Sequence, residues 1–132
     1  MLFKLIILKK IEEGIVLVKF NNPQNMKEVI VSWSGGKDSC LACYKAMGKG
    51  HPIGFLLNLI SKEYQRCCFH GIRKELINLQ ANLIGIPLFQ KEVSINMDLY
   101  EKEFKEAVLY LETKGVKGIV FRHSRLPVNS LE

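Results

Sequence analysis

The sequence predicts an α/β fold in which a parallel sheet is flanked by helices. From Lys27 onward, apolar runs of strand length alternate with longer stretches whose apolar residues recur every three or four positions. Clusters of glycine and proline separate these stretches at residues 48–52 and 85–87. Strands that alternate with helices of this length are typical of βαβ units with right-handed crossovers. A chain of 132 residues, 48% hydrophobic and 24% charged, also has the size and composition of one globular domain.

Four strands are expected along this alternating part of the chain. Residues 28–33 form a continuous apolar run of the kind that is buried on both faces of a parallel sheet. The other expected strands are residues 53–60, 87–93 and 118–121. Ligands of such sheets bind beyond the carboxyl ends of the strands, where the strand order reverses, and the loop after residue 33 lies at such an end.

Three amphipathic helices are expected between these strands, each with one apolar stripe toward the core. The first, about residues 38–47, has the stripe Cys40, Cys43, Tyr44 and Met47. The second closes at Gly85 and has the stripe Ile72, Leu76, Leu79 and Leu83. The third ends near Gly115 and has the stripe Tyr100, Phe104, Ala107, Val108 and Leu111. Beside the third stripe we expect a solvated face on which three acidic residues pair with neighbouring lysines: Glu101, Glu103 and Glu106 with Lys102 and Lys105.

The segment before residue 26 lies outside the alternating pattern. Residues 3–8 and 15–20, joined through Glu12-Glu13-Gly14, are expected to form a β-hairpin, and residues 21–25 a turn or linker. We therefore divide the chain into an N-terminal extension (1–25), a central domain (26–121) and a short tail (122–132).

Composition disfavours several classes of protein. The net charge is +6, but the basic residues are dispersed along the chain, so nucleic acid is an unfavoured partner. Lys4 interrupts the apolar N-terminal segment, and no run has the length of a membrane span, so we expect a cytoplasmic protein without membrane contact. The pairs Cys40/Cys43 and Cys67/Cys68 lack the spacing of a metal site and are interpreted as reduced thiols.

The most informative segment is Ser-Gly-Gly-Lys-Asp-Ser at residues 34–39, which follows the first strand and opens the first helix. Unpaired backbone N–H groups and the positive end of the helix dipole favour phosphate oxygens there. The glycines allow a sharp turn and close approach of a ligand, Lys37 adds a mobile charge, and Ser34 and Ser39 add hydroxyl donors. The residues therefore predict a phosphate-binding loop, with a plain turn capped by Asp38 or Ser39 as the structural alternative.

The spacing decides which phosphate-binding loop this is. A Walker-type loop needs glycine five positions before Gly36 and Ser or Thr after Lys37, but these positions hold Val31 and Asp38. A carboxylate beside polyphosphate is repelled unless a cation lies between them, so Asp38 implies Mg²⁺.

The hexapeptide resembles the SGGxDS pyrophosphate loop (PP-loop) of N-type ATP pyrophosphatases. Together with the segments at 31–46, 56–61, 69–88 and 100–108, it makes the chain similar to the diphthine–ammonia ligase family. The resemblance implies an adenine nucleotide α hydrolase-like (Rossmann-like, HUP) fold. It also implies an ATP-dependent ligase that amidates diphthine, the modified histidine of translation elongation factor 2, using ATP and ammonium and releasing AMP and diphosphate.

The resemblance also assigns roles to residues. The β and γ phosphates would be held by Ser34, Gly35, Gly36, Lys37 and Ser39. Asp38 would hold Mg²⁺, and Lys37 and Asp38 are the candidates for catalysis. Residues 58–61 and Phe69, with His70 and Gly71, are candidates for the adenosine side of the nucleotide.

The ends of the chain leave alternatives open. Family members usually leave the fourth strand through a Gly-Asp pair and continue into a second half that receives the substrate, whereas here Arg122 follows Phe121 and the chain stops at Glu132. We therefore expect an ATP-dependent ligase or only its ATP-binding half, from a truncated or frameshifted gene or from a split protein that needs a partner chain; a homo-oligomer is a further alternative. A tRNA-modifying enzyme with the same loop and a non-catalytic ATP-binding remnant are the alternative functions.

Overall fold

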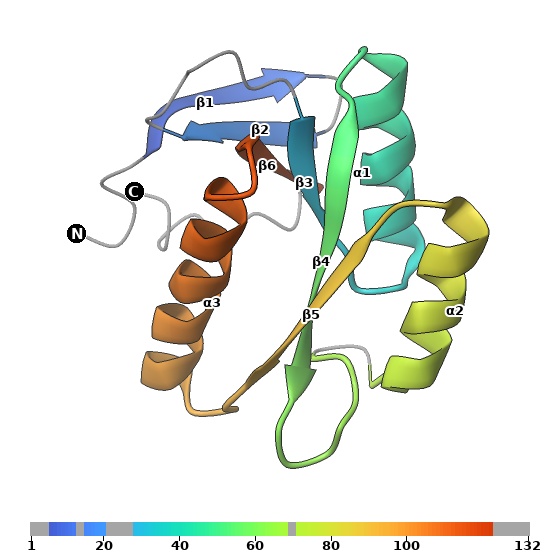
Figure 1. Ribbon diagram of the computed structural model, residues 1–132, viewed down its shortest axis with the longest axis vertical. Helices are drawn as coiled ribbons and strands as arrows, with labels where there is room; N and C mark the ends of the chain where they lie inside the picture. Colours follow the sequence, from blue (N-terminus) through green and yellow to red (C-terminus); the bar gives the residue numbers. More distant parts are fainter. Residues whose placement is uncertain (1–5, 13–14, 21–27, 69–70, 123–132) are drawn as a thin grey trace.

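The computed structural model describes residues 6–12, 15–20, 28–68 and 71–122 (Figure 1). Along the chain the elements are β1 (Ile6–Glu12), β2 (Ile15–Phe20), β3 (Glu28–Ser32), α1 (Lys37–Gly48), β4 (Ile53–Ser61), α2 (Lys74–Ile84), β5 (Leu88–Val93), α3 (Met97–Glu112) and β6 (Val116–Arg122). The four strands and three helices expected after residue 27 are therefore all present, with ends shifted by a few residues.

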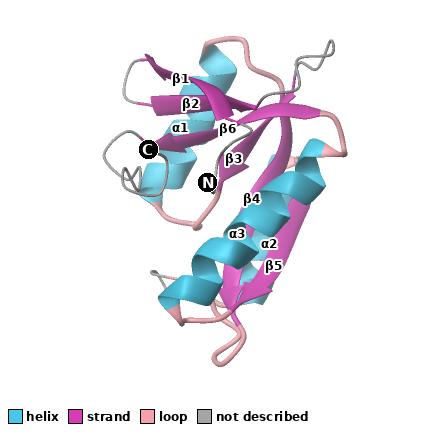
Figure 2. Ribbon diagram, turned by 90° about the vertical axis from the view of Figure 1, so that its left-hand side faces the viewer, coloured by secondary structure: helices cyan, strands magenta, loops and turns pink. Residues whose placement is uncertain are grey.

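The strands form one six-stranded sheet in the order β1-β2-β6-β3-β4-β5. The four strands β6, β3, β4 and β5 run parallel, and β2 pairs antiparallel with both β1 and β6. Helices α1 and α2 cover one face of the sheet, and α3 covers the other (Figures 1 and 2). The predicted α/β class is confirmed, and the architecture is consistent with the adenine nucleotide α hydrolase-like fold.

The core consists of two apolar layers, one on each face of the sheet. Because alternate residues of a strand point to opposite faces, β2 sends Ile15 and Leu17 into the layer under α1 and α2, and Val16 and Val18 into the layer under α3. Burial on both faces explains why the central strands appear in the sequence as continuous apolar runs.

The winding of the sheet reverses beside β3. From β3 the chain proceeds outward to β4 and β5, and after α3 it returns to place β6 against the opposite edge of β3. The carboxyl ends of β3 and β6 therefore lie next to each other at the switch point, which is the position where open parallel sheets bind ligands.

The predicted N-terminal hairpin is confirmed, although its first strand is Ile6–Glu12 rather than residues 3–8. The hairpin is continuous with the central sheet, because β2 pairs with β6 along residues 15–19. The two strands approach so closely that a Cβ atom at Gly118 would lie 2.5 Å from the carbonyl oxygen of Val18. Residues 21–25 and 123–132 lie outside the described residues, and the division of the chain at residues 25 and 121 stays a prediction.

The predicted buried stripe of the second helix is wrong at three of its four positions, while Ile72, which lies before α2, does pack against the core. Leu76, Leu79 and Leu83 are 49%, 51% and 80% exposed, and α2 buries Ile77 and Ala81 instead. The helix has apolar residues on more than one face, so periodicity did not single out the side that meets the sheet.

The predicted stripe of the first helix is also mostly wrong. Cys43 is buried, but Cys40 is exposed and Tyr44 and Met47 are 74% and 55% exposed. The buried face of α1 consists of small residues, Ser39, Ala42, Cys43 and Ala46, which let a helix lie close to a sheet.

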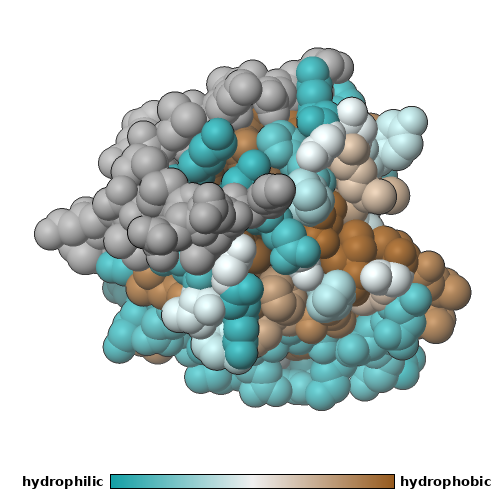
Figure 3. Space-filling model, turned by 45° about the horizontal axis from the view of Figure 1, so that its top comes forward, coloured by the Kyte–Doolittle hydropathy of each residue, from teal (hydrophilic) through white to brown (hydrophobic). Residues whose placement is uncertain are grey.

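The stripe of α3 is confirmed at its centre, since Ala107, Val108 and Leu111 are buried. On the face drawn in Figure 3, apolar residues (brown) reach the surface among hydrophilic ones (teal). Within the described ranges, no helix is long and apolar enough to cross a membrane.

Candidate phosphate-binding site

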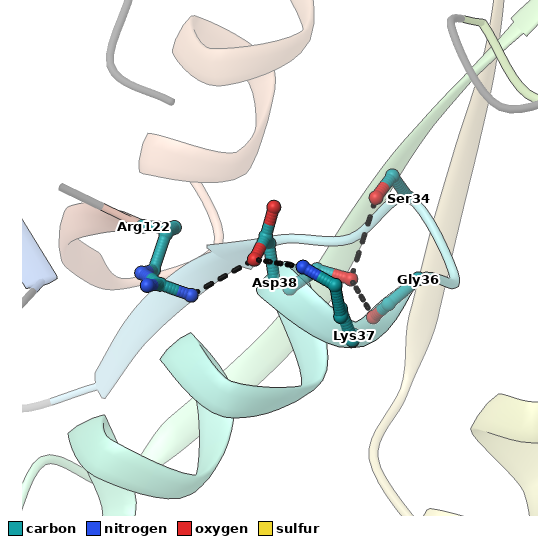
Figure 4. Close-up of polar contacts among 6 residues, drawn as sticks. Ser34, Gly36, Lys37, Asp38 and Arg122 are labelled. Carbon is teal, nitrogen blue, oxygen red and sulfur yellow. Dashed lines mark hydrogen bonds and ion pairs between the residues drawn. The ribbon is translucent and has the colours of Figure 1, made fainter. Parts of the chain in front are cut away.

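The segment at residues 33–36 connects the carboxyl end of β3 directly to α1 (Figure 4). Gly36 is the N-cap residue of α1 in an extended conformation, and no side chain caps the helix there. The first-turn N–H groups and the positive end of the helix dipole are thus directed at the switch point of the sheet. This local geometry favours an anion, and the predicted phosphate-binding role of the loop stays a prediction.

Gly35 is required at its position for two independent reasons. Its φ of +85° lies in the left-handed region, which residues with a Cβ atom rarely adopt. A Cβ atom would also lie 2.6 Å from Cδ1 of Ile77 and 3.0 Å from Cδ1 of Ile72. The loop therefore packs directly on α2 and on the residues before it.

The hydroxyls of Ser34 and Ser39 form hydrogen bonds with other atoms of the loop. Ser39 is buried, and its Oγ donates to the carbonyl oxygen of Gly36 at 3.1 Å. The Oγ of Ser34 donates to the Oγ of Ser39 at 3.4 Å (Figure 4). These bonds link the first turn of α1 to the segment that enters it.

Lys37 and Asp38 differ strongly in exposure. The Lys37 side chain is 92% exposed, and its Nζ lies 3.5 Å from Oδ1 of Asp38, whose side chain is 14% exposed. The same Oδ1 accepts a hydrogen bond of 2.8 Å from Nη1 of Arg122 (Figure 4). Arg122, with the exposed Lys37 more weakly, therefore offsets the negative charge of the Asp38 carboxylate, which lowers its repulsion of an acidic ligand.

Arg122 is the site residue that the sequence analysis missed as a participant. In the sequence Arg122 stands where family members usually have a Gly-Asp pair, and in the structure it lies at the carboxyl end of β6, beside the carboxyl end of β3. The signal that could have found it is topological. A charged residue that ends one parallel strand lies near the loop that ends its neighbour.

The other residues predicted for the site, at positions 58–61 and 69–71, lie outside the loop itself. Gly71 has a φ of +69°, its N–H donates to the carbonyl oxygen of Cys67, and its own carbonyl accepts from Nη1 of Arg66. His70 and Phe69 lie outside the described residues. Asn58 is fully buried, and its Nδ2 donates to the carbonyl oxygen of Trp33, so this side chain supports the loop from within the sheet.

Burial raises the pKa of the Cys43 thiol, with a smaller contribution from Cys40. Burial also raises the pKa of Cys68, and Cys67 and Glu63 add to the effect. Both thiols therefore stay protonated at neutral pH, which disfavours a nucleophilic role. Among the described residues, no three His, Cys, Asp or Glu side chains are grouped so that they could hold a metal ion.

Comparison with protein families gives a match to the diphthamide synthase N-terminal domain over residues 26–125. The chain belongs to this family. The match includes the whole loop at 34–39, Gly71 and Arg122, and begins just before β3. No curated protein matches the chain. The family is one of ATP-dependent diphthine–ammonia ligases, which fits an anion-binding loop at the switch point of the sheet.

Proposed function

We propose that the loop at residues 34–39 binds the phosphates of ATP, and that the chain supplies ATP-dependent adenylation for the amidation of diphthine. The observation that carries the proposal is the uncapped N-terminus of α1 at the switch point, reached through the left-handed Gly35. An anion bound there would meet backbone N–H groups and the exposed Lys37 side chain together. Family membership adds ATP as the phosphate ligand and the diphthine of elongation factor 2 as the acceptor, in the cytoplasm.

The donor set at the loop fits Mg²⁺ together with phosphate. Asp38 is the acidic residue of the first turn, and a single carboxylate plus phosphate oxygens and water is a usual way to hold this ion. When bound, Mg²⁺ would neutralise charge on the phosphates that leave. Arg122 donates to the same carboxylate and would hold it in place until the metal and the nucleotide arrive.

The chemistry would proceed in two displacements. A carboxylate oxygen of diphthine attacks the α phosphate of ATP, and the bond between the α and β phosphates breaks to release diphosphate. Ammonia then attacks the acyl carbon and AMP leaves. The residues of this loop act on the first step, because donors arranged in advance around the β and γ phosphates stabilise the charge of the leaving diphosphate.

Calorimetric titration with Mg-ATP tests the binding part of the proposal. The wild-type chain is expected to bind Mg-ATP, and Asp38→Ala and Gly36→Val are expected to weaken binding by at least about tenfold. Cys40→Ser is the matched control, because Cys40 lies one helical turn beyond Gly36 and is exposed. Unchanged affinity in both loop variants would refute the assignment of the loop.

Exchange of labelled diphosphate into ATP tests the adenylating part. With diphthine-bearing elongation factor 2 present, the chain alone or with a partner chain is expected to catalyse the exchange. Binding of Mg-ATP without any exchange under these conditions would favour the non-catalytic remnant.

A further inference from the structure

Three consecutive backbone carbonyls of the loop are each held by a side chain from elsewhere in the fold. The carbonyls are those of Trp33, Ser34 and Gly35, and their donors, in the same order, are Asn58 Nδ2 at 2.8 Å, Cys67 Sγ at 3.3 Å and Gln80 Nε2 at 3.2 Å. We call Asn58, Cys67 and Gln80 the loop anchors. They come from β4, from the segment that follows it and from α2, so three parts of the fold converge on three adjacent peptide groups.

Further hydrogen bonds fix the orientation of two anchors. Oε1 of Gln80 accepts from Nε1 of Trp33 at 3.0 Å, so the amide of Gln80 bridges the indole and the carbonyl of Gly35. Oδ1 of Asn58 accepts from Nε2 of Gln90 at 3.3 Å, and its Nδ2 also reaches Sγ of Cys67. Asn58 is fully buried, so its amide is part of the interior of the protein.

The anchored carbonyls determine the direction of the intervening N–H groups. In a trans peptide the C=O of one residue and the N–H of the next point in opposite directions, and the described residues contain no cis peptide bond. With the carbonyls of Trp33, Ser34 and Gly35 held by the anchors, the N–H groups of Ser34, Gly35 and Gly36 face away from the anchors. Within the described part of the chain, none of these N–H groups donates a hydrogen bond.

We propose that Asn58, Cys67 and Gln80 are positioning residues that set the peptide orientation of the loop before a phosphate binds. This role rests on the proposed binding of phosphate by the loop. A free loop of this kind could turn its carbonyls toward the ligand, where their negative ends would repel phosphate. The anchors exclude that orientation, so the N–H groups need no rearrangement when the anion arrives.

The test is calorimetric titration of the whole chain with inorganic pyrophosphate and Mg²⁺, and in parallel with AMP, which lacks the β and γ phosphates. Gln80→Met removes both amide hydrogen bonds and keeps the side-chain length. It is expected to weaken pyrophosphate binding about tenfold and to change AMP binding less than about twofold. Asn82→Met, on the exposed side of the same helix, is the matched control and is expected to bind like the wild type.

A second pair of variants separates hydrogen bonding from packing. Cys67→Ala removes the donor to Ser34, and is expected to weaken pyrophosphate binding about threefold. Cys67→Ser retains a donor of similar size, and should restore the wild-type affinity. Circular dichroism would reveal whether Gln80→Met folds. If it does not, the two Cys67 variants alone test the positioning role.

The outcomes are distinguishable. Wild-type affinity in Gln80→Met and Cys67→Ala would overturn the positioning role while leaving the loop as the phosphate site. Equal losses for pyrophosphate and AMP, or failure of Cys67→Ser to restore binding, would show general damage and also overturn it. Absence of pyrophosphate binding by the wild-type chain would refute the proposed function, and with it the positioning role.

Discussion

The guanidinium of Arg122 occupies one oxygen, Oδ1, of the Asp38 carboxylate, which we propose as the ligand of Mg²⁺. Nη1 of Arg122 donates to Oδ1 of Asp38 at 2.8 Å, and a charge-assisted bond of this kind contributes about 1.5–3 kcal/mol. A metal ion bound at Oδ1 would therefore compete with Arg122 for the carboxylate. Replacing the guanidinium with an uncharged side chain removes the competitor.

Arg122→Met is thus expected to lower the Mg²⁺ concentration needed for half-maximal ATP binding, by about fivefold or more. Titration of Mg²⁺ at a fixed ATP concentration measures this value directly. Arg66→Met is the control, because Arg66 bonds to the carbonyl of Gly71 and not to Asp38. A Mg²⁺ requirement that stays constant or rises would contradict competition at Asp38.

Glu103 connects α3 to the ends of two strands. Its Oε1 accepts from the N–H of Ser94 at 2.8 Å, and its Oε2 lies 3.2 Å from Nζ of Lys62. The hydrogen bond from Ser94 is the main cause of a lowered pKa at Glu103, and Lys62 adds to it. The sequence analysis expected Glu103 to pair with Lys102 or Lys105, but its partner is Lys62, beyond the end of β4.

A lowered pKa in the folded state has a defined consequence for stability. The ionised Glu103 stabilises the fold at pH values above its ordinary pKa of about 4.5, and this contribution is lost as the pH falls through the lower folded value. Glu103→Gln should therefore be less stable than the wild type at pH 7, and the difference should disappear toward pH 3. Urea unfolding across this range measures it, and a difference independent of pH would contradict the assignment.

At the scale of elements, α2 provides a matched pair of substitutions. Ile77 is fully buried between α2 and the sheet, whereas Leu83 on the same helix is 80% exposed. Ile77→Ala should lower the free energy of unfolding by about 2–5 kcal/mol, and Leu83→Ala should change it by less than about 0.5 kcal/mol. Chemical denaturation of both variants tests the observed face of α2. Similar losses would instead support the stripe that the sequence suggested.

The N-terminal hairpin can be tested through the strand on which it packs. A Cβ atom at Gly118 would meet the carbonyl oxygen of Val18, so Gly118→Ala must push β2 away from β6. We expect a loss of about 1–3 kcal/mol in the free energy of unfolding. Gly48→Ala is the control, because Gly48 ends α1 with open space around it. This substitution should leave the free energy of unfolding unchanged or raise it slightly. Equal stability of the two variants would mean that the hairpin is not integral to the sheet.

At the scale of the whole molecule, periodicity was sufficient for the architecture and insufficient for the orientation of two helices. The strands could be predicted because burial on both faces leaves unbroken apolar runs, as at residues 29–31 in β3. The buried faces of α1 and α2 could not, since both helices also have apolar residues on exposed faces. Small residues such as Ala42 and Ala46 contact the sheet in place of the larger Tyr44 and Met47.

The candidate site also has a part that the sequence predicts and a part that it does not. The residues of the loop are contiguous, so their composition and spacing were enough to single out the loop as a candidate phosphate-binding site. Its supporting contacts join distant positions: Arg122 and Asp38 are 84 residues apart, and Gln80 and Gly35 are 45 apart. Only the order of the strands and the packing of α2 bring these pairs together, which a single sequence read for local patterns does not contain.

The most direct test of the account is a crystal structure of the chain with a non-hydrolysable ATP analogue and Mg²⁺. We predict the β and γ phosphates at the N-terminus of α1, within hydrogen-bonding distance of backbone N–H groups at residues 35–39, and the metal ion at Asp38. A nucleotide bound elsewhere on the molecule, with this loop in contact with none of its phosphates, would contradict the central claim.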